Sequence, residues 1–115
     1  MNERKDERLD AINLLDYTVL DEKGYTINQA MGRTLNVSER GILLDTHIPF
    51  RVGQTLVLAL ELEEEIVELT GKVVHTEKND QGRYSSGIEF ENLSAEGQKT
   101  LHKYLEAFNS ARTLQ

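Results

Sequence analysis

Cysteine and tryptophan are absent from this 115-residue chain, and proline occurs once. Without cysteine the chain can form neither a disulfide framework nor a thiolate metal site, and it has no thiol nucleophile. Long apolar runs are also missing, so no segment approaches the length of a membrane span and we expect no membrane insertion. The first ten residues are charged where a signal peptide would be apolar, which favours a cytoplasmic protein.

Positive charge is scarce, with 13 Lys and Arg residues against 20 Asp and Glu residues and a formal net charge of -7. Proteins that bind DNA or RNA usually hold the phosphates on a basic face, so we expect neither as a partner. An aromatic content of 6% also counts against an oligonucleotide-binding barrel, which stacks bases on aromatic rings. A small anion can still bind where a few cations gather, because charges are screened over roughly 8 Å.

Short segments in which apolar and polar residues alternate make up most of the chain after residue 11. The clearest runs from Thr55 to Leu62, where leucine occupies every second position, as in a half-buried strand. Gly32 interrupts another segment, and we expect a bulge or sharp bend there. Turn signals lie at 22–24, 63–65 and 79–82. We predict about six strands, which include residues 12–21, 25–31, 55–62, 66–75 and 84–91.

The pattern changes to a helical period near the C-terminus. Ser94 is a suitable helix cap, and four apolar residues follow at helical spacing, which are Leu101, Tyr104, Leu105 and Phe108. Short antiparallel strands in this number close into a barrel or a sandwich, with the helix over an open end. We therefore expect one mainly β domain at 12–109, a flexible N-terminal arm at 1–11 and a tail at 110–115. The four apolar residues should pack on the barrel, although part of this set could dock a partner.

Two short motifs carry the functional argument. The arm reads R-x-x-x-R from Arg4 to Arg8 and also contains Lys5, so three of the 13 basic residues lie within five positions. A second motif, N-x-S-x-x-G, runs from Asn36 through Ser38 to Gly41. Taken alone, the first is typical of a solvated charged tail and the second of a polar turn.

The two motifs in this order, followed by a G-[IV]-x-F-x-x-L-S segment at 87–94, resemble the PilZ family of bacterial cyclic di-GMP receptors. The resemblance spans Arg4 to about Phe108. It implies a six-stranded antiparallel β-barrel with a C-terminal helix, which agrees with the strand count above. It also implies a nucleotide-binding module for second-messenger signalling, not an enzyme, with cyclic di-GMP as ligand and no cofactor or metal. The implied ligand contacts are Arg4, Arg8, Asn36, Ser38 and Gly41, with Lys5 and Gly87 as weaker candidates.

These residue types suit a ligand with two phosphates and two guanines. The planar fork of arginine matches both phosphate oxygens and the O6/N7 edge of guanine, and it also stacks on bases. Asn36 offers a donor and an acceptor to a base edge, Ser38 offers a hydroxyl, and Gly41 leaves room for close backbone approach. We expect the arm to change conformation when it closes over the ligand, and a downstream protein to detect this change.

The sequence departs from the family pattern at two places. Many members carry arginine just before R-x-x-x-R, where this chain has Glu3, and some carry an aromatic residue at the position of Ser85. Both differences predict weaker binding, and the carboxylate of Glu3 also disfavours a stacked pair of ligands. Glu3 and the acidic residues of the arm leave open an alternative function as a protein-interaction adaptor that binds no nucleotide, in motility or pilus assembly. We expect a monomer or a weak homodimer.

Other polar residues favour structural roles. The three histidines, at 47, 75 and 102, lack the spacing of metal ligands. The acidic run at 61–65 lacks the ligand spacing and the glycine of a calcium loop. Ser38 has no histidine partner at a recognisable spacing, so it is not expected to be a nucleophile.

Overall fold

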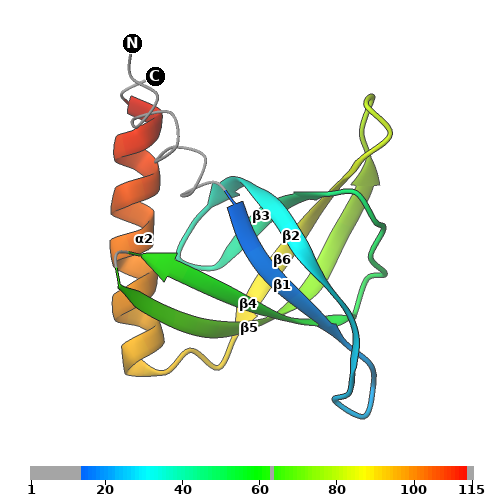
Figure 1. The fold of residues 1–115 in the computed structure, drawn as a ribbon, viewed down its shortest axis with the longest axis horizontal. Helices are drawn as coiled ribbons and strands as arrows, with labels where there is room; N and C mark the ends of the chain where they lie inside the picture. The colour runs from blue at the N-terminus through cyan, green and yellow to red at the C-terminus, as the bar shows by residue number, and fades with distance from the viewer. Residues whose placement is uncertain (1–13, 63, 114–115) are drawn as a thin grey trace.

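Six β-strands and one helix make up the part of the chain that the structure, a computed structural model, describes at residues 14–62 and 64–113. All neighbouring strands are antiparallel, and they close into a barrel in the order β1-β2-β3-β6-β5-β4 (Figure 1). The predicted six-stranded barrel with a C-terminal helix is confirmed. The elements are β1 (Leu14–Leu20), β2 (Thr26–Val37), β3 (Gly41–Thr46), β4 (Thr55–Leu62), β5 (Glu65–Lys78), β6 (Tyr84–Glu91) and α2 (Ala95–Thr113).

The barrel interior is apolar because alternate residues of each strand point inward. On β4, whose bounds match the prediction, Leu56, Leu58 and Leu60 are each 0% exposed. Tyr17 of β1 packs edge-on against Phe50 from the β3–β4 loop, with ring centroids 5.2 Å apart. The hydrophobic core therefore runs from the interior of the strands to the loop that follows β3.

Strands β5 and β6 form the other side of the barrel. β6 has the predicted bounds, with Ser86 and Ile88 buried and Phe90 half-buried. β5 extends beyond the predicted 66–75 at both ends. Three alternate side chains on its outer face are exposed, as the alternation of a strand predicts, and they are Glu68, Thr70 and Lys72.

Helix α2 covers one end of the barrel, where it contacts β4 and β5 (Figure 1). Ser94 caps it as predicted, because the Ser94 hydroxyl oxygen accepts the Gly97 N–H at 2.9 Å. Leu101, Tyr104 and Phe108 are buried, so the expected packing face is confirmed, with Leu105 half-buried at its edge. The helix continues to Thr113, past the expected boundary at residue 109. In the described part of the chain, no helix is long and apolar enough to cross a membrane.

Strand β2 departs from a regular ladder. Gly32 pairs in register with Leu15, so of the bulge or sharp bend expected at Gly32 the bulge is wrong. A Cβ at Gly32 would lie 3.0 Å from the Thr46 methyl carbon and 3.4 Å from the Tyr17 ring, so the glycine makes room for packing. The register shifts instead between Thr34 and Asn36, opposite β3.

The first part of β2 projects away from the barrel with β1 as a hairpin (Figure 1). Residues 26–29 are all exposed, so the alternation predicted for this segment buries neither of its faces. From Gly32 onward the inward positions are buried, up to Val37. β2 therefore changes from an exposed ribbon into a barrel strand along its own length.

Candidate ligand-binding site

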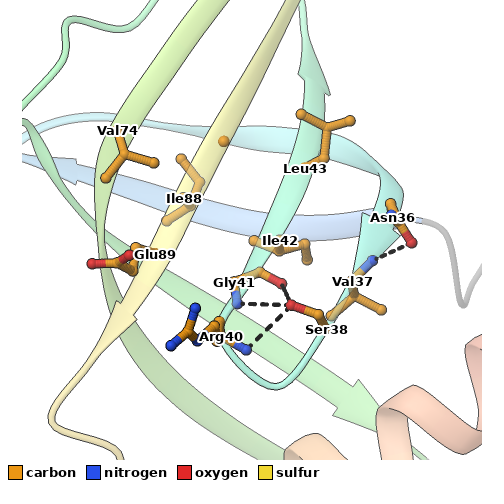
Figure 2. Close-up of a pocket in the computed structure, with 11 residues that line it drawn as sticks. Asn36, Val37, Ser38, Arg40, Gly41, Ile42, Leu43, Val74, Ile88 and Glu89 are labelled. Carbon is orange, nitrogen blue, oxygen red and sulfur yellow. Dashed lines mark hydrogen bonds between the residues drawn. The ribbon is translucent and has the colours of Figure 1, made fainter.

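The N-x-S-x-x-G motif forms the connection between β2 and β3, which we call segment 36–41. The Ser38 N–H donates to the Gly41 carbonyl at 2.8 Å. The Ser38 hydroxyl oxygen accepts the backbone N–H groups of Arg40 at 3.2 Å and Gly41 at 3.3 Å (Figure 2). Ser38 is therefore the residue that folds the turn. Its own O–H makes only a long 3.5 Å contact to the Gly41 carbonyl, so this proton can be donated to a ligand oxygen instead.

Gly41 is needed because two strands approach closely at this point. It pairs with Glu89 of β6, and a Cβ at Gly41 would collide with the Ile88 carbonyl oxygen. The Phe90 N–H also donates to the Arg40 carbonyl at 2.8 Å. The close approach expected at Gly41 is therefore made by the backbone of β6, which fixes segment 36–41 against that strand.

A groove of about 290 Å³ lies beside segment 36–41 on the outer face of β3, β6 and β5. Leu43 of β3 and Val74 of β5 are among the residues that line it (Figure 2), and Gly87 lines it from β6. Val74 is 51% exposed because the register of β5 against β6 shifts between Val73 and His75. The lining contributed by the three strands is thus largely apolar.

Gly87 differs from Gly41 in the space that would be available to a Cβ atom. The nearest atom to a Cβ at Gly87 would be the Cβ of His75 at 3.7 Å, which is ordinary van der Waals contact. Packing within the protein therefore does not require glycine at this position. The missing side chain keeps the surface between Leu43 and Val74 flat, which suits a planar group lying on it.

The polar margin of the groove carries both signs of charge. Asn36, Ser38 and Arg40 lie along segment 36–41, and Glu89 lies on β6 (Figure 2). The Asn36 side-chain oxygen Oδ1 accepts the Val37 N–H at 3.0 Å. Arg40 is exposed and adds a cation close to Ser38, whereas the carboxylate of Glu89 disfavours phosphate on its side of the groove.

Four of the seven predicted ligand contacts therefore line one groove, and these are Asn36, Ser38, Gly41 and Gly87. The other three, Arg4, Lys5 and Arg8, lie outside the described residues, as does Glu3. Leu14, the first described residue, pairs with Arg33, three positions before Asn36.

Four further residues line the groove although the sequence did not identify them as site residues, and they are Arg40, Leu43, Val74 and Glu89. For Val74 there was a signal, because two consecutive valines break the alternation of β5 and cannot both point inward. Leu43 and Glu89 had none, since their meeting depends on the pairing of β3 with β6.

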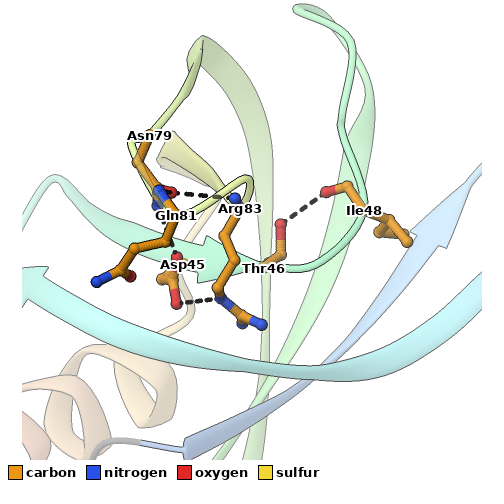
Figure 3. Close-up of polar contacts among 6 residues, drawn as sticks. All are labelled: Asp45, Thr46, Ile48, Asn79, Gln81 and Arg83. Carbon is orange, nitrogen blue, oxygen red and sulfur yellow. Dashed lines mark hydrogen bonds and ion pairs between the residues drawn. The ribbon is translucent and has the colours of Figure 1, made fainter.

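A second polar cluster lies at the other end of β3 (Figure 3). The Asp45 carboxylate accepts the Arg83 Nε–H at 2.8 Å and the Asn79 amide at 3.2 Å. The Asn79 side-chain oxygen accepts the backbone N–H groups of Gln81 and Arg83, each at 3.0 Å. These contacts bind the β5–β6 turn to β3, and the carboxylate of Asp45 neutralises Arg83. We therefore assign this cluster a structural role.

Within residues 14–62 and 64–113, no group of three or more His, Cys, Asp or Glu side chains could hold a metal ion. The residues that line the groove offer hydrogen bonds, apolar contact and a few charges. The groove suits a planar, polar ligand whose negative charge is balanced mainly by cations from outside the groove.

Comparison with known proteins agrees with this description. A sequence profile of the PilZ domain matches residues 2–107. No protein with curated function matches the chain. Several solved structures share its fold at low sequence identity.

The Bacillus subtilis inhibitor of motility MotI/DgrA has a TM-score of 0.62 and 19% identity, with 84% of this chain and 47% of that chain covered. Klebsiella pneumoniae MrkH in complex with c-di-GMP has a TM-score of 0.62 and 15% identity, with 86% and 47% covered. The PilZ domain of Escherichia coli YcgR with c-di-GMP has a TM-score of 0.61 and 9% identity, with 86% and 84% covered. The chain thus spans about half the length of MotI/DgrA and MrkH.

Proposed function

The chain belongs to the PilZ domain family, and from this premise we propose that it is a cyclic di-GMP receptor and not an enzyme. The ligand would lie on the outer face of β3 and β6, in the groove beside segment 36–41. The observation that carries the proposal is that Asn36, Ser38 and Gly41 of the N-x-S-x-x-G motif line one groove together with Gly87, which comes from a distant part of the chain. The PilZ-fold structures of MrkH and YcgR that contain c-di-GMP support the choice of ligand.

The chemistry of the groove matches the parts of this ligand. The flat apolar surface of Leu43, Val74 and Gly87 can accept the face of a guanine. The amide of Asn36 can pair with a base edge, and the Ser38 hydroxyl can donate to a phosphate oxygen. Arg40 contributes positive charge at the margin.

The size of the groove explains why an arm is needed. Pockets that enclose a drug-sized ligand usually have volumes of about 300–1,000 Å³. The groove, at about 290 Å³, is at the bottom of this range, and the ligand has two guanines and two phosphates. We propose that Arg4 and Arg8, with Lys5 beside them, supply the second wall and most of the positive charge. Ordering of the arm on binding would then be the change that a downstream protein detects in the bacterial cytoplasm.

The test is a thermal melt of the full chain with cyclic di-GMP, with GTP and cyclic di-AMP as controls. Ligand at a hundred times its dissociation constant adds about 2.7 kcal/mol, which raises Tm by roughly 8 °C or more. The Arg4→Ala, Arg8→Ala double variant should lose this rise. Lys23→Ala, Arg51→Ala is the matched control, because it removes the same charge from a groove at the far end of β1. A rise that survives in the arm variant would contradict the proposal.

Glu89 supports one alternative, because a carboxylate in the groove opposes phosphate binding. In this alternative the domain is a protein-interaction adaptor that does not respond to nucleotide. No Tm rise at millimolar cyclic di-GMP, together with a partner captured equally well with and without nucleotide, would favour the adaptor.

A further inference from the structure

Strand β2, just before segment 36–41, is connected to helix α2 through a buried hydrogen bond. The Thr34 hydroxyl and the Tyr104 hydroxyl lie 2.9 Å apart. Thr34 is 3% exposed and Tyr104 is 2% exposed, so water does not compete for this bond. Burial raises the pKa of Tyr104, and the hydrogen bond to Thr34 partly offsets that increase. The phenol therefore keeps its proton at neutral pH and can donate it.

The bond lies where β2 loses its register with β3. Thr34 pairs with Leu44 and Asn36 pairs with Leu43, so Leu35 is an additional residue on β2. Ladder hydrogen bonds do not fix a bulged residue, and the direction of the next side chain depends on the bulge. Asn36 is that next residue and lines the groove. The contact between Thr34 and Tyr104 is therefore in a position to set where Asn36 points.

A second contact, at the surface, joins segment 36–41 itself to α2. Glu39 of segment 36–41 lies 3.8 Å from His102 Nε2 on α2, and both side chains are largely exposed. Exposed ion pairs contribute little free energy, so the buried bond carries the connection.

Accepting the proposed function, we propose that Tyr104 is a positioning residue for the ligand site. It acts through Thr34 to hold the β2 bulge, and the bulge holds Asn36 and the turn at Ser38. Coupling between two sites is reciprocal, so a ligand that fixes the bulge also stabilises α2 on the barrel end. α2 is then an element through which occupancy of the groove is transmitted.

A purely structural role for Tyr104 is the competing explanation, because its ring also stacks on Phe108 at 6.5 Å. The Thr34→Val, Tyr104→Phe double variant separates the two roles. It keeps both shapes and removes both polar groups, and paired replacement of this kind is nearly neutral for stability. A structural role thus predicts unchanged stability and unchanged affinity. The positioning role predicts near-normal stability with weaker binding.

The experiment measures cyclic di-GMP affinity and backbone amide hydrogen exchange in the full chain. We expect the double variant to bind about three- to tenfold more weakly than the wild type, the loss expected for one net hydrogen bond. Without ligand, the amides of Ser38, Arg40 and Gly41 should exchange faster. With ligand, the wild type should show slower exchange in α2. Tyr25→Phe is the control, because the Tyr25 side chain is 68% exposed and far from the groove.

Each outcome decides the proposal. Unchanged affinity and unchanged exchange in segment 36–41 would overturn the positioning role while leaving the receptor function intact. If the wild type does not bind cyclic di-GMP, the receptor function fails, and exchange in segment 36–41 alone decides whether α2 positions it. If the double variant does not fold, Tyr104→Phe alone, which removes one oxygen atom, is measured in its place.

Discussion

Strands β4 and β2 belong to the same barrel but differ in regularity and in role. β4 pairs without interruption with β1 and β5, and its inward leucines are fully buried. β2 begins as an exposed ribbon, shifts its register near Leu35 and ends in the turn that borders the groove. The regular strand builds the core. The irregular strand supports the proposed binding site, because a register shift turns side chains away from the positions that a regular ladder would give them.

Leu58→Ala on β4 should have the largest effect on stability. Its side chain is 0% exposed, and truncating a buried leucine costs about 2–5 kcal/mol through lost burial and the cavity left behind. Urea unfolding monitored by circular dichroism measures the loss. Ile27→Ala, at a 55% exposed position on β2, is the control and should stay within about 0.5 kcal/mol of wild type. Equal losses would remove the distinction between the two strands.

Gly41→Ala should have the next largest effect, because it disturbs the end of β2 and the start of β3. The added methyl collides with the Ile88 carbonyl, and overpacking of this kind costs about 1–3 kcal/mol. Gly87→Ala is the matched comparison, with no contact closer than 3.7 Å, so its stability should equal or slightly exceed that of wild type.

Ligand titration completes this comparison. Gly41→Ala should lose binding together with stability, whereas Gly87→Ala should lose binding alone, because its methyl rises from the flat surface between Leu43 and Val74. Unchanged affinity in Gly87→Ala would show that the ligand does not lie on that surface.

The regular part of the molecule was predictable from the sequence, and the irregular part was not. Strict alternation gave the bounds of β4, and Ser94 marked the start of α2. The register shift of β2 lies between Thr34 and Asn36 and not at Gly32, and the sequence did not locate it because it is a property of the pairing of β2 with β3. The motif residues of the groove were predicted from a family resemblance. Glu89 was not, since the sequence does not show that β3 pairs with β6.

Ser38→Ala should lower the free energy of unfolding by less than Leu58→Ala or Gly41→Ala. It removes the acceptor for the Arg40 and Gly41 N–H groups, and one net hydrogen bond is worth about 1 kcal/mol. Affinity for cyclic di-GMP should also fall, because both the turn and the hydroxyl donor are lost. Ser38→Thr keeps the hydroxyl and should restore most of both, while Ser110→Ala on the exposed side of α2 is the control. A stable Ser38→Ala protein with normal affinity would show that the hydroxyl serves neither purpose.

The smallest effect on stability comes from the protonation of the buried phenols, and it appears only in alkaline solution. Burial raises the pKa of both Tyr17 and Tyr104 above the ordinary value of 10.0, opposed by the charge of Arg83 at Tyr17 and the Thr34 bond at Tyr104. Above pH 10 the unfolded chain releases these protons before the folded chain does. The stabilisation is therefore complete below pH 10 and is lost as the pH rises through the raised values.

Urea unfolding at a series of pH values from 8 to 11 tests whether the end of β2 next to the groove is as well buried as β4. The wild type should lose stability above pH 10, and Tyr104→Phe should lose less over the same interval, because one of the two phenols is gone. Tyr25→Phe removes an exposed hydroxyl on the hairpin and should follow the wild-type curve. If Tyr104→Phe also follows it, the phenol is not held protonated by burial, and the end of β2 next to the groove is more open than the interior of β4.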